Sequence, residues 1–504
     1  MRRPPPPAAV LAVVSFGVFI AADDLTVAAT MLRQIIGDLG IPLPEGMNDA
    51  AWIVNAYLVA YVAVMPFMGR LSDVVGRRPV FVGALVVFLA GSVWVPLAPS
   101  LGWFIGGRVM TAIGGGAMVP VALAAVADVY EERRRPAALG VLGAVDTIGW
   151  VWGPLFGAML VRYLNWRWQF HLNIPLALIG IAASWWALGG LRRPVERRRM
   201  GWGAAVALSA FLVGLNVALL QAGRISGVSD LAELADITGG SDLPALPVLA
   251  VAAVALAAFV WLELRSRDPL IDLRLFTVPN ISPALGVNFL VGTALVVAMV
   301  DVPLFVNLVV ETDLKRAAVA SGWVLSALTG SMAATAYLGG VLTGKTWYRP
   351  VVVAGLLLAG GGLLIMGSSW RPGTGTAVMA AHLLLVGSGF GLLTAPTNAA
   401  VVDAVPPERR GVAAGLVILA RLLGLAVGLS GLTAWFLHRF ETLRDGLDLP
   451  PASDPGYRDA LDAAREQVTA SALAETFVFA AALLAVALVL AWRLRRSSGV
   501  GLTS

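Results

Sequence analysis

The sequence predicts an all-α membrane protein with fourteen transmembrane helices, arranged as six, two and six. Three observations lead to this prediction. First, 58% of the 504 residues are hydrophobic and 13% are charged, whereas soluble domains carry about 25% charged residues. Second, fourteen apolar segments approach or exceed the length of about 20 residues that a helix needs to cross a bilayer. Third, motifs of the first half recur in the second half.

The apolar segments follow one another along the chain with mostly short polar connections. The first six run over Ala8 to Met31, Ala51 to Met68, Val80 to Leu97, Leu101 to Tyr130, Ala137 to Leu164 and Leu172 to Leu188. Two more run over Gly203 to Leu220 and Ala245 to Leu262. The last six run over Pro283 to Val310, Val319 to Leu342, Val351 to Met366, Ala377 to Val402, Val412 to Leu437 and Ser471 to Trp492. This order predicts an N-terminal six-helix bundle over residues 1–190, two inserted helices with linkers over 191–279, and a C-terminal six-helix bundle over 280–504.

Basic residues gather on one side of the predicted membrane. If both termini are inside, about two thirds of the 36 Lys and Arg residues lie on the inner side. Because basic residues near helix ends are retained in the cytoplasm, both termini are expected to be cytoplasmic. Asp23 and Asp24 interrupt the first apolar run and no small-residue cleavage site follows, so this run is expected to be a retained helix and not a signal peptide. With no cysteine, disulfides and thiolate metal sites are excluded.

An internal repeat divides the chain into two halves. Gly69, Leu71, Arg78, Pro79 and Val80 match Gly340, Leu342, Arg349, Pro350 and Val351 at an offset of 271. Asp128, Arg134, Arg135, Gly140, Gly149 and Gly153 match Asp403, Arg409, Arg410, Gly415, Gly424 and Gly428 at an offset of 275. Such a duplication relates the halves by an axis along the membrane normal, and transporters bind substrate at the midplane between their repeats. The repeat therefore predicts transport and not an enzymatic activity.

The loop from Gly69 to Pro79, GRLSDVVGRRP, carries one acid and three arginines between two apolar segments. An acid at Asp73 can bind the N-terminus of a helix in the other half, which stabilises one arrangement of the halves by about 0.3–1 kcal/mol. The alternative is that the arginines only retain the loop inside. Because Gly344 replaces Asp73 in the second copy, the latch is expected to be one-sided. The expected latch residues are Gly69, Asp73, Gly76, Arg77 and Arg78.

The loop closely resembles the loop signature of the major facilitator superfamily. Arg108 with Gly114 resembles the fourth-helix motif of that family. The fifth-helix motif of its antiporters resembles Gly149, Gly153, Pro154 and Gly157. Together with the helix count, these motifs resemble the fourteen-helix drug:proton antiporter branch. The resemblance implies the major facilitator fold, a helix beginning near Gly411 as the partner of Asp73, and a glycine ridge between the halves that limits leakage. From the residues alone, close packing of the fifth helix on a neighbour explains the same ridge.

Charged residues within the predicted helices are the candidates for coupling transport to protons, because each is costly in a membrane unless it is paired or hydrated. Asp24 matches the acid of the family's first-helix motif, and an apolar environment disfavours its ionised form, so it can bind and release a proton. The alternative is a hydrated polar residue. Asp301 lies near the repeat equivalent of Asp24 and is a second candidate. Arg108 is expected to neutralise an acid in the N-terminal half.

Asp146 and Arg421 occupy equivalent positions in the two halves at the offset of 275. Each lies about 15 Å from the inner end of its helix, which places both near the midplane. They can form an ion pair between the halves that protonation breaks, or each can have a partner of its own.

Two outer segments are longer than the other loops. Residues Arg224 to Leu243 predict a small external loop. After PPASDPG, the stretch Tyr457 to Glu475 has good helix formers with apolar residues at helical spacing. If this stretch continues into the last span, the helix has about 40 residues and is about 60 Å long, twice the thickness of the hydrocarbon layer. A helical extension over about residues 439–475 is therefore expected outside the membrane.

Further stretches resemble the mycobacterial members of the branch that export triacylglycerides from the inner membrane. These stretches are ADDLTVAATMLRQI, VDVPLF and LARLLGLAVG. In that pattern the fifth-helix acid falls where this chain has Thr147, one residue after Asp146, which puts the pairing of Asp146 with Arg421 in question.

The resemblance implies a monomeric, proton-driven, alternating-access exporter of lipids in a bacterial cytoplasmic membrane. It implies no cofactor, metal or nucleic acid, and an extracytoplasmic lipid-carrier lipoprotein as partner. The alternatives are a multidrug:proton antiporter that exports lipophilic drugs, and a scaffold or lipid sensor that transports nothing. The cost of the membrane acids argues against the scaffold.

Overall fold

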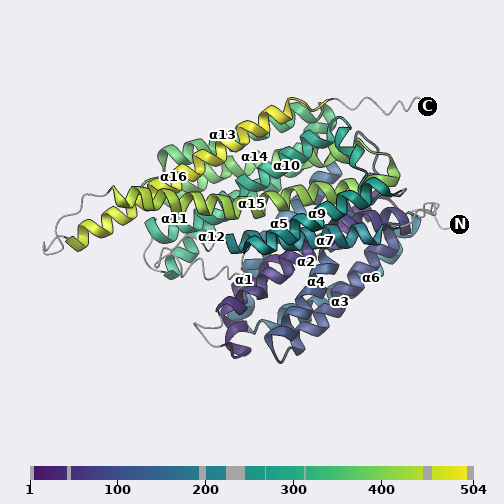
Figure 1. Ribbon diagram of the computed structural model, residues 1–504, viewed down its shortest axis with the longest axis horizontal. Coiled ribbons are helices and arrows are strands. Elements are labelled where there is room, and N and C mark those ends of the chain that lie inside the picture. The colour runs from purple at the N-terminus through teal and green to yellow at the C-terminus, as the bar shows by residue number, and fades with distance from the viewer. Residues whose placement is uncertain are drawn as a thin grey trace.

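The computed structural model describes residues 5–41, 47–191, 200–222, 245–266, 268–310, 314–446 and 457–495. The predicted outer loop at 224–243 and the basic cluster at 192–199 lie outside this part of the chain. Within it, fourteen helices are long and apolar enough to cross a membrane, which confirms the predicted number. The protein is therefore an all-helical, multi-pass membrane protein (Figure 1).

The N-terminal half has six long helices. They are α1 (Pro7–Asp38), α2 (Met47–Val75), α3 (Arg77–Trp94), α4 (Leu101–Val129), α5 (Arg135–Tyr163) and α6 (Arg167–Ala187). Short 3₁₀ turns follow α3 at Val95–Leu97 and α6 at Leu188–Gly190. Gly76 separates α2 from α3 with a φ of 109°, a left-handed backbone conformation that glycine adopts without steric cost.

The C-terminal half repeats this order after two inserted helices, α7 (Trp202–Ala222) and α9 (Ala245–Arg265). Its long helices are α10 (Ile281–Val296), α12 (Leu314–Lys345), α13 (Tyr348–Ser369), α14 (Thr376–Asp403), α15 (Arg410–Asp445) and α16 (Tyr457–Ala491). Short 3₁₀ turns precede α10 at Leu273–Thr277 and α15 at Pro407–Arg409.

The span that begins with α10 differs from the single regular helix predicted over Pro283 to Val310. After α10 the chain forms a π-helical turn at Val297–Asp301, a short α11 at Val302–Phe305 and a second π-helical turn at Val306–Val310. Pro303 has no backbone N–H, so the regular ladder of helical hydrogen bonds cannot continue through it. Such turns inside a helix are frequent at functional sites, and Asp301 lies at the end of the first one.

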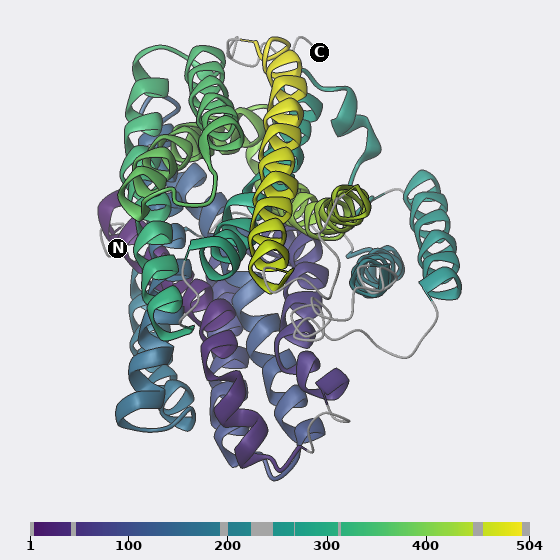
Figure 2. The same cartoon turned by 90° about the vertical axis from the view of Figure 1, so that its left-hand side faces the viewer.

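The same helix pairs pack together in both halves. In the N-terminal half α1 packs on α5, α2 on α4, and α3 on α4 and α6. In the C-terminal half α10 packs on α15, α12 on α14, and α13 on α14 and α16. The duplication seen in the sequence is therefore present in the packing, and Figure 2 shows the two bundles, purple to blue and green to yellow, one above the other.

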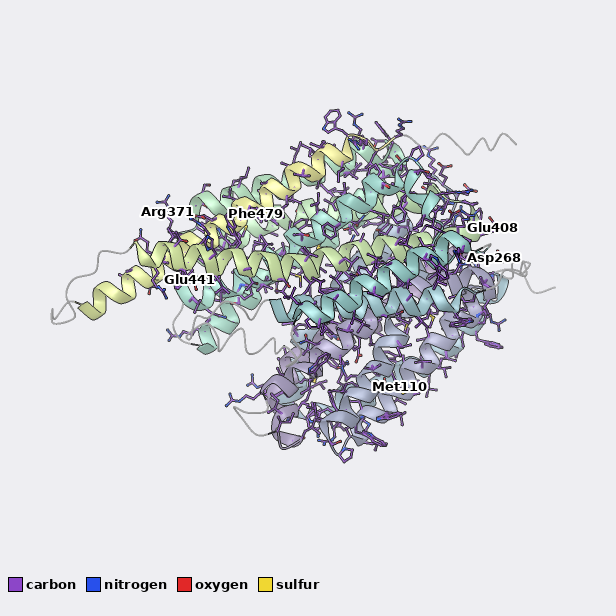
Figure 3. All side chains as sticks on the ribbon, in the orientation of Figure 1. Met110, Asp268, Arg371, Glu408, Glu441 and Phe479 are labelled. Atoms are coloured by element: carbon purple, nitrogen blue, oxygen red, sulfur yellow. The ribbon has the colours of Figure 1, made fainter. Side chains whose placement is uncertain are left out.

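The two ends of the molecule are different. Helix α1 begins and α16 ends on one side, here called the terminal face, where Figure 3 labels Asp268 and Glu408. The opposite side, here called the extension face, carries Arg371 and Glu441. Helices of the two halves converge at the terminal face and separate toward the extension face (Figure 1). At the convergence, α2 packs on α15 and α5 packs on α12.

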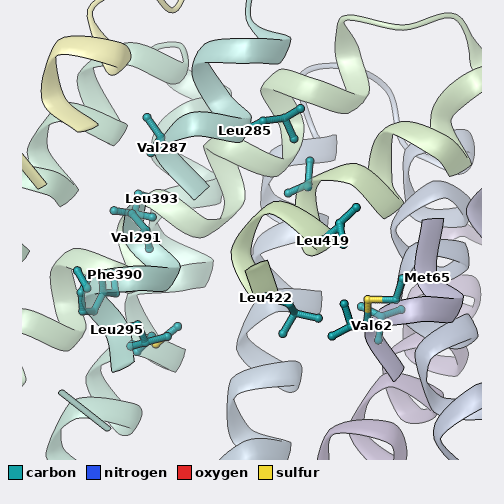
Figure 4. Close-up of a cluster of buried hydrophobic side chains, with 14 of the residues drawn as sticks. Val62, Met65, Leu285, Val287, Val291, Leu295, Phe390, Leu393, Leu419 and Leu422 are labelled. Atoms are coloured by element: carbon teal, nitrogen blue, oxygen red, sulfur yellow. The ribbon is translucent and has the colours of Figure 1, made fainter. Parts of the chain in front are cut away.

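Apolar side chains fill the space where the halves converge. Figure 4 shows Leu419 and Leu422 of α15 near Val62 and Met65 of α2, all of them buried. A side chain at Gly415 would come within 3.1 Å of the Met65 carbonyl oxygen, so the two backbones are close at this point. The two halves are thus closely packed against each other at this point.

The inserted helices lie on the flank of the bundle, where Figure 2 shows α7 and α9 in teal beside the other helices. Helix α7 contacts both halves. Ser209 donates a hydrogen bond to the Ala63 carbonyl of α2 at 3.1 Å, and Ser430 of α15 donates one to the Leu219 carbonyl of α7 at 2.8 Å. Helix α7 therefore bridges the halves along one side, and α9 packs on α7.

Helices α15 and α16 extend beyond the other helices at the extension face (Figure 1). Helix α16 has 35 residues and α15 has 36, so each is about 53 Å long. Arg439 binds both carboxylate oxygens of Glu475, at 2.5 and 2.7 Å, and ties the two helices together. The two helices thus project past the rest of the bundle, although α16 is somewhat shorter than the predicted 40 residues. The position of this projection outside the membrane stays a prediction.

Candidate functional site

Asp73 lies in the last turn of α2 and binds the N-terminus of α15. Its carboxylate accepts hydrogen bonds from the backbone N–H groups of Gly411 at 2.9 Å and Val412 at 3.0 Å. These groups have no partner within their own helix, and the helix dipole makes that end favourable for a negative charge. A side chain at Gly411 would come within 2.8 Å of Arg77 and Ser72, and its backbone contacts that of Gly69. The glycines allow the approach, and the acid binds the helix end.

Arg77 joins this contact to a network of buried charges. Its guanidinium lies 2.6 Å from Asp73 and 3.1 Å from Asp128 of α4. Arg410 of α15 lies 3.1 Å from the other oxygen of Asp128, which makes this ion pair a bond between the halves. Two acids and two arginines therefore meet with no net charge, and Arg77 is only 3% exposed.

Arg78, which was expected in the latch, lies elsewhere. Its guanidinium stacks on the Trp185 ring of α6 at 3.8 Å from the ring centre, within the N-terminal half. Neighbouring residues at the start of a helix point about 100° apart. Arg77 therefore faces the other half and Arg78 faces the outside of its own half.

The second copy of the latch contains a different set of groups. At the position of Arg77 the repeat has Tyr348, whose hydroxyl donates to Asp403 of α14 at 2.6 Å. Asp403 is the repeat equivalent of Asp128, and it pairs with Arg135 of α5 in the other half. Gly344, at the position of Asp73, lies against the backbone of Arg133. The repeat pattern could have pointed to Tyr348, because it lies at the same offset of 271 as the glycines around it.

Asp24 is fully buried within the N-terminal half. Arg108 of α4 donates to its carboxylate at 2.8 Å and to its carbonyl at 3.0 Å, and Asn173 of α6 donates at 3.2 Å. The Tyr57 ring lies under the Arg108 guanidinium at 4.2 Å. Arg108 thus neutralises an acid of its own half. Gly114 lets α4 approach α3, because a side chain there would come within 2.6 Å of the Phe88 nitrogen.

Asp23 is adjacent in sequence to Asp24 but has a different hydrogen-bond partner. Gln169 of α6 donates to its Oδ2 at 2.7 Å. Oδ1 of Asp23 and Oε1 of Gln169 are both buried acceptors without a hydrogen-bond partner in the described part of the chain. A proton on Asp23 would provide the donor that this acid–amide pair lacks. Sequence reasoning missed Gln169 and Asn173, since neither belongs to a motif.

The fifth-helix glycine ridge packs against α1 and does not lie between the halves, which corrects the expectation from the resemblance. A side chain at Gly149 would come within 2.6 Å of Ala22, and one at Gly153 within 2.8 Å of the Asp23 carbonyl. Gly157 continues the same contact along α1, and Pro154 lies inside α5 on the same stretch. Close packing of two helices accounts for the ridge.

A cavity lies between the halves, with about 960 Å³ of space that no protein atom fills, part of it open to the surroundings. Its walls are mainly apolar and come from both halves. The apolar lining consists of Val18, Val119, Leu123, Leu142, Leu295, Met299, Leu328, Met332, Val417, Ile418, Leu422 and Leu425. Two charged residues line the same cavity, Asp146 and Arg421. The arrangement can hold an apolar molecule next to one acid and one base.

Asp146 and Arg421 both face this cavity but do not form an ion pair in the described structure. Arg421 donates instead to the Asn288 side chain of α10 at 3.2 Å. Thr147 also lines the cavity. Its hydroxyl donates a hydrogen bond to the Gly143 carbonyl of its own helix at 2.9 Å. Asp146 and Arg421 thus lie in the same cavity between the halves without pairing, which agrees with the alternative in which each has a partner of its own.

Asp301 is buried at 8% exposure and contacts the extended helix α16. Its Oδ2 lies 2.7 Å from the Thr476 hydroxyl, which is also 2.7 Å from the Leu473 carbonyl. A hydroxyl has one proton to donate. If Thr476 donates it to Leu473, the short contact with Asp301 requires a proton on the carboxyl group. Asp301 does not line the central cavity.

The sequence profile of the Major Facilitator Superfamily matches residues 14–429 and 289–502. The chain belongs to the major facilitator superfamily. This membership, with the fourteen spans, makes it a membrane transporter and not an enzyme.

Several curated members of the superfamily are similar over most of their length. The triacylglyceride transporter of Mycobacterium tuberculosis strain H37Rv is 33% identical over 470 residues, which cover 90% of this chain and 88% of the relative. A probable triacylglyceride transporter of Mycobacterium leprae is 32% identical over 461 residues, covering 87% and 86%. A triacylglyceride transporter of Mycobacteroides abscessus is 30% identical over 463 residues, covering 89% and 86%.

Solved structures share the fold at low sequence identity. The proton:xylose symporter XylE aligns over 98% of this chain and 97% of its own, with a TM-score of 0.63 and 14% identity. The human organic anion transporter MFSD10 aligns over 97% of this chain and 100% of its own, with a TM-score of 0.61 and 18% identity. These likenesses confirm the major facilitator fold.

Proposed function

We propose that this protein exports lipids, such as triacylglycerides, or other hydrophobic molecules from the cytoplasmic membrane of a bacterium. The observation that carries the proposal is the cavity between the halves, whose walls are mainly apolar. An apolar cavity at the repeat interface suits a hydrophobic cargo. The relatives named as triacylglyceride transporters support a lipid as that cargo.

The proposed transport works by alternating access, with the terminal face on the cytoplasmic side. In the described arrangement Asp73, Arg410 and Arg135 join the halves at the terminal face. The opposite arrangement requires these contacts to break while new ones form at the extension face. A ligand shifts such an equilibrium only through different affinities for the two states. Cargo in the cavity and protons on buried acids are the proposed ligands.

Protons are the proposed driving force, so no cofactor is needed. Asp24 and Asp301 are buried acids whose neutral and ionised forms bind their surroundings differently, through Arg108 and Thr476 respectively. Asp146 adds a third acid inside the cavity, where its charge acts on Arg421 across the gap. A proton on Asp146 would weaken that attraction and leave Arg421 with Asn288. Intramembrane acids with such partners are typical of proton relays.

The extension is the proposed contact for an extracytoplasmic lipid-carrier lipoprotein. Helices α15 and α16 project together, joined by Arg439 and Glu475. The double variant Arg439→Ala with Glu475→Ala should reduce delivery of lipid to a soluble acceptor, while exchange of lipid between the leaflets of the same vesicle continues. Equal loss of both activities would contradict a delivery role.

Lipid movement in proteoliposomes tests the proposal. The wild-type protein should move a labelled triacylglyceride when a proton gradient is imposed, and Asp24→Asn should abolish the movement. Asp38→Asn is the matched control, because Asp38 lies on the same helix but pairs with Arg167 at 39% side-chain exposure. It should retain transport.

The acid in the cavity also suits a lipophilic cation, so a multidrug:proton antiporter is the second candidate. Drug-dependent proton flux without lipid movement would replace the lipid proposal by this one.

A further inference from the structure

A groove on the terminal face of the C-terminal half has no part in the proposed transport. It holds about 1290 Å³ of space that no protein atom fills, part of it open to the surroundings. The segment 276–283 before and into α10, residues 347 and 349 at the start of α13, and residues 492–495 after α16 form its walls. Three of its lining residues are arginines, namely Arg349, Arg493 and Arg495, and none of the lining residues is acidic. The groove therefore attracts anions.

Two tight contacts hold the groove in shape. The Arg349 guanidinium stacks on the Trp492 ring at 3.8 Å from its centre, which is a favourable cation–π geometry. The Asn280 side chain donates to the Arg495 carbonyl at 3.1 Å and accepts from the Arg495 N–H at 2.7 Å. Asn280 is buried at 7% exposure. Its two hydrogen bonds therefore connect the segment before α10 with the residues that follow α16.

The groove lies at the level where the membrane surface is expected. The candidate spans Ile281–Val310, Tyr348–Ser369 and Glu466–Ala491 all have one end at this groove. Trp347 precedes one span and Trp492 follows another, and tryptophan is enriched at the boundary between lipid and water. Trp492 is 57% exposed and Phe276 is 42% exposed. Apolar surface next to three arginines matches a molecule with a phosphate head and hydrocarbon tails.

We propose that this groove binds the head group of an acidic phospholipid from the membrane leaflet at the terminal face. Arginine binds phosphate oxygens through two parallel N–H groups, which a lysine cannot reproduce. Basic pockets between transmembrane helices bind acidic head groups on the cytoplasmic side. The lipid would hold α10, α13 and α16 together at one end, and the exposed rings of Phe276 and Trp492 would meet its glycerol and upper acyl region.

The N-terminal half contains the same arginine–tryptophan stack. Arg78, the repeat equivalent of Arg349, stacks on Trp185 at the same distance of 3.8 Å. The Arg–Trp stack is thus a duplicated feature of the terminal face. Arg493 and Arg495 lie beside the C-terminal stack, whereas residues 192–199, which follow α6 in the N-terminal half, lie outside the described part of the chain.

Lipid binding to the purified full chain tests this proposal without reference to transport. The probes are dioleoyl phosphatidylglycerol, dioleoyl phosphatidylcholine and inorganic phosphate, each added to detergent-solubilised protein and followed by native mass spectrometry. Phosphatidylglycerol should bind tightly and the other two weakly. The double variant Arg349→Gln with Arg493→Gln should weaken phosphatidylglycerol binding about tenfold or more, since each surface arginine contributes to the attraction. Arg371→Gln is the matched control, because it removes one positive charge from an exposed loop on the extension face, and it should bind as the wild type does.

Several results would overturn the proposal. Equal binding of phosphatidylglycerol and phosphatidylcholine would remove the role of charge, and unchanged binding by the double variant would place the lipid elsewhere. Inorganic phosphate bound as tightly as the lipid would indicate a soluble phosphate compound as the ligand. A photoreactive phosphatidylglycerol provides a measurement that needs no variant, since it should label wild-type peptides containing residues 347–349 and 492–495. Labelling elsewhere would contradict the assignment even if the double variant did not fold.

Discussion

The two clusters that join the halves at the terminal face derive from one repeat and hold different charges. In both, an acid at the end of one helix pairs with an arginine from the other half, as Asp128 does with Arg410 and Asp403 does with Arg135. The first cluster adds Arg77 and Asp73. The second has Tyr348 and Gly344 at those positions.

The comparison shows why Asp73 accompanies Arg77. With both present, the first cluster has two acids and two arginines and no net charge. Without Asp73, the Asp128 carboxylate would face two guanidiniums, the buried one of Arg77 and the partly buried one of Arg410, with a single negative charge between them. The second cluster avoids this because the Tyr348 hydroxyl is neutral, so a glycine can replace the acid. A buried charge without a partner is costly. Charge balance therefore explains why the acid is present in only one cluster, in addition to the helix end that Asp73 binds.

The largest effect is expected for Arg135→Gln. Asp403 would keep the Tyr348 hydroxyl as a hydrogen-bond partner but would lose its ion pair, and breaking a buried pair costs about 3–5 kcal/mol. Arg410→Gln should cost less, because Asp128 keeps Arg77. Thermal unfolding of the purified protein should therefore show the lower midpoint for Arg135→Gln. Equal midpoints would mean that the two clusters do not differ in this way.

A smaller effect is expected for Asp73→Asn, which removes the charge at the α15 helix end and leaves Arg77 in excess. Transport should fall about tenfold or more without a change in the choice of cargo. Adding Arg77→Tyr, which copies the second cluster, should restore part of the activity because it removes the unbalanced charge. The measurement is transport in proteoliposomes for the single and double variants. If the double variant is no better than Asp73→Asn, charge balance is not the reason for the acid, and an altered cargo profile would contradict a purely conformational role.

Tyr348→Phe should have a modest effect. It removes one hydrogen bond to a charged acid, worth about 1.5–3 kcal/mol, but leaves the ion pair of Asp403 with Arg135. Spin labels on cysteines introduced at Val75 and Glu408 can follow the distance across the terminal face, since the chain has no cysteine of its own. A small increase in the open population is expected. A fully open distribution would mean that the hydroxyl and not the ion pair holds the second cluster.

The smallest effect is expected for Arg409→Gln. Arg409 pairs with Asp272 at 2.8 Å, but the two side chains are 34% and 22% exposed, and exposed ion pairs contribute about 0–1 kcal/mol. The same spin-label pair should give nearly the wild-type distribution. A large opening would show that charges outside the buried clusters control the terminal face.

The sequence by itself determined the features that depend on local length and composition. The number of spans and the duplication follow from apolar runs and repeated motifs, and both are present. The long last helix is present as well, while its projection outside the membrane stays a prediction. The family resemblance also identified the helix end at Gly411 that Asp73 binds. Small errors in the predicted helix boundaries do not change these features, because the hydropathy pattern and the repeat spacing each involve many residues.

Only the tertiary structure decided which side chains meet. Each residue along a helix turns the side chain by about 100°, so the rotation of the packed helices places Arg77 between the halves and Arg78 on Trp185. The same rotation and packing set the glycine ridge against α1. They also leave Arg421 with Asn288 while Asp146 lies across the cavity. Partners such as Arg108 and Asp24 are separated by 84 residues, and no local pattern contains the packing that brings them together.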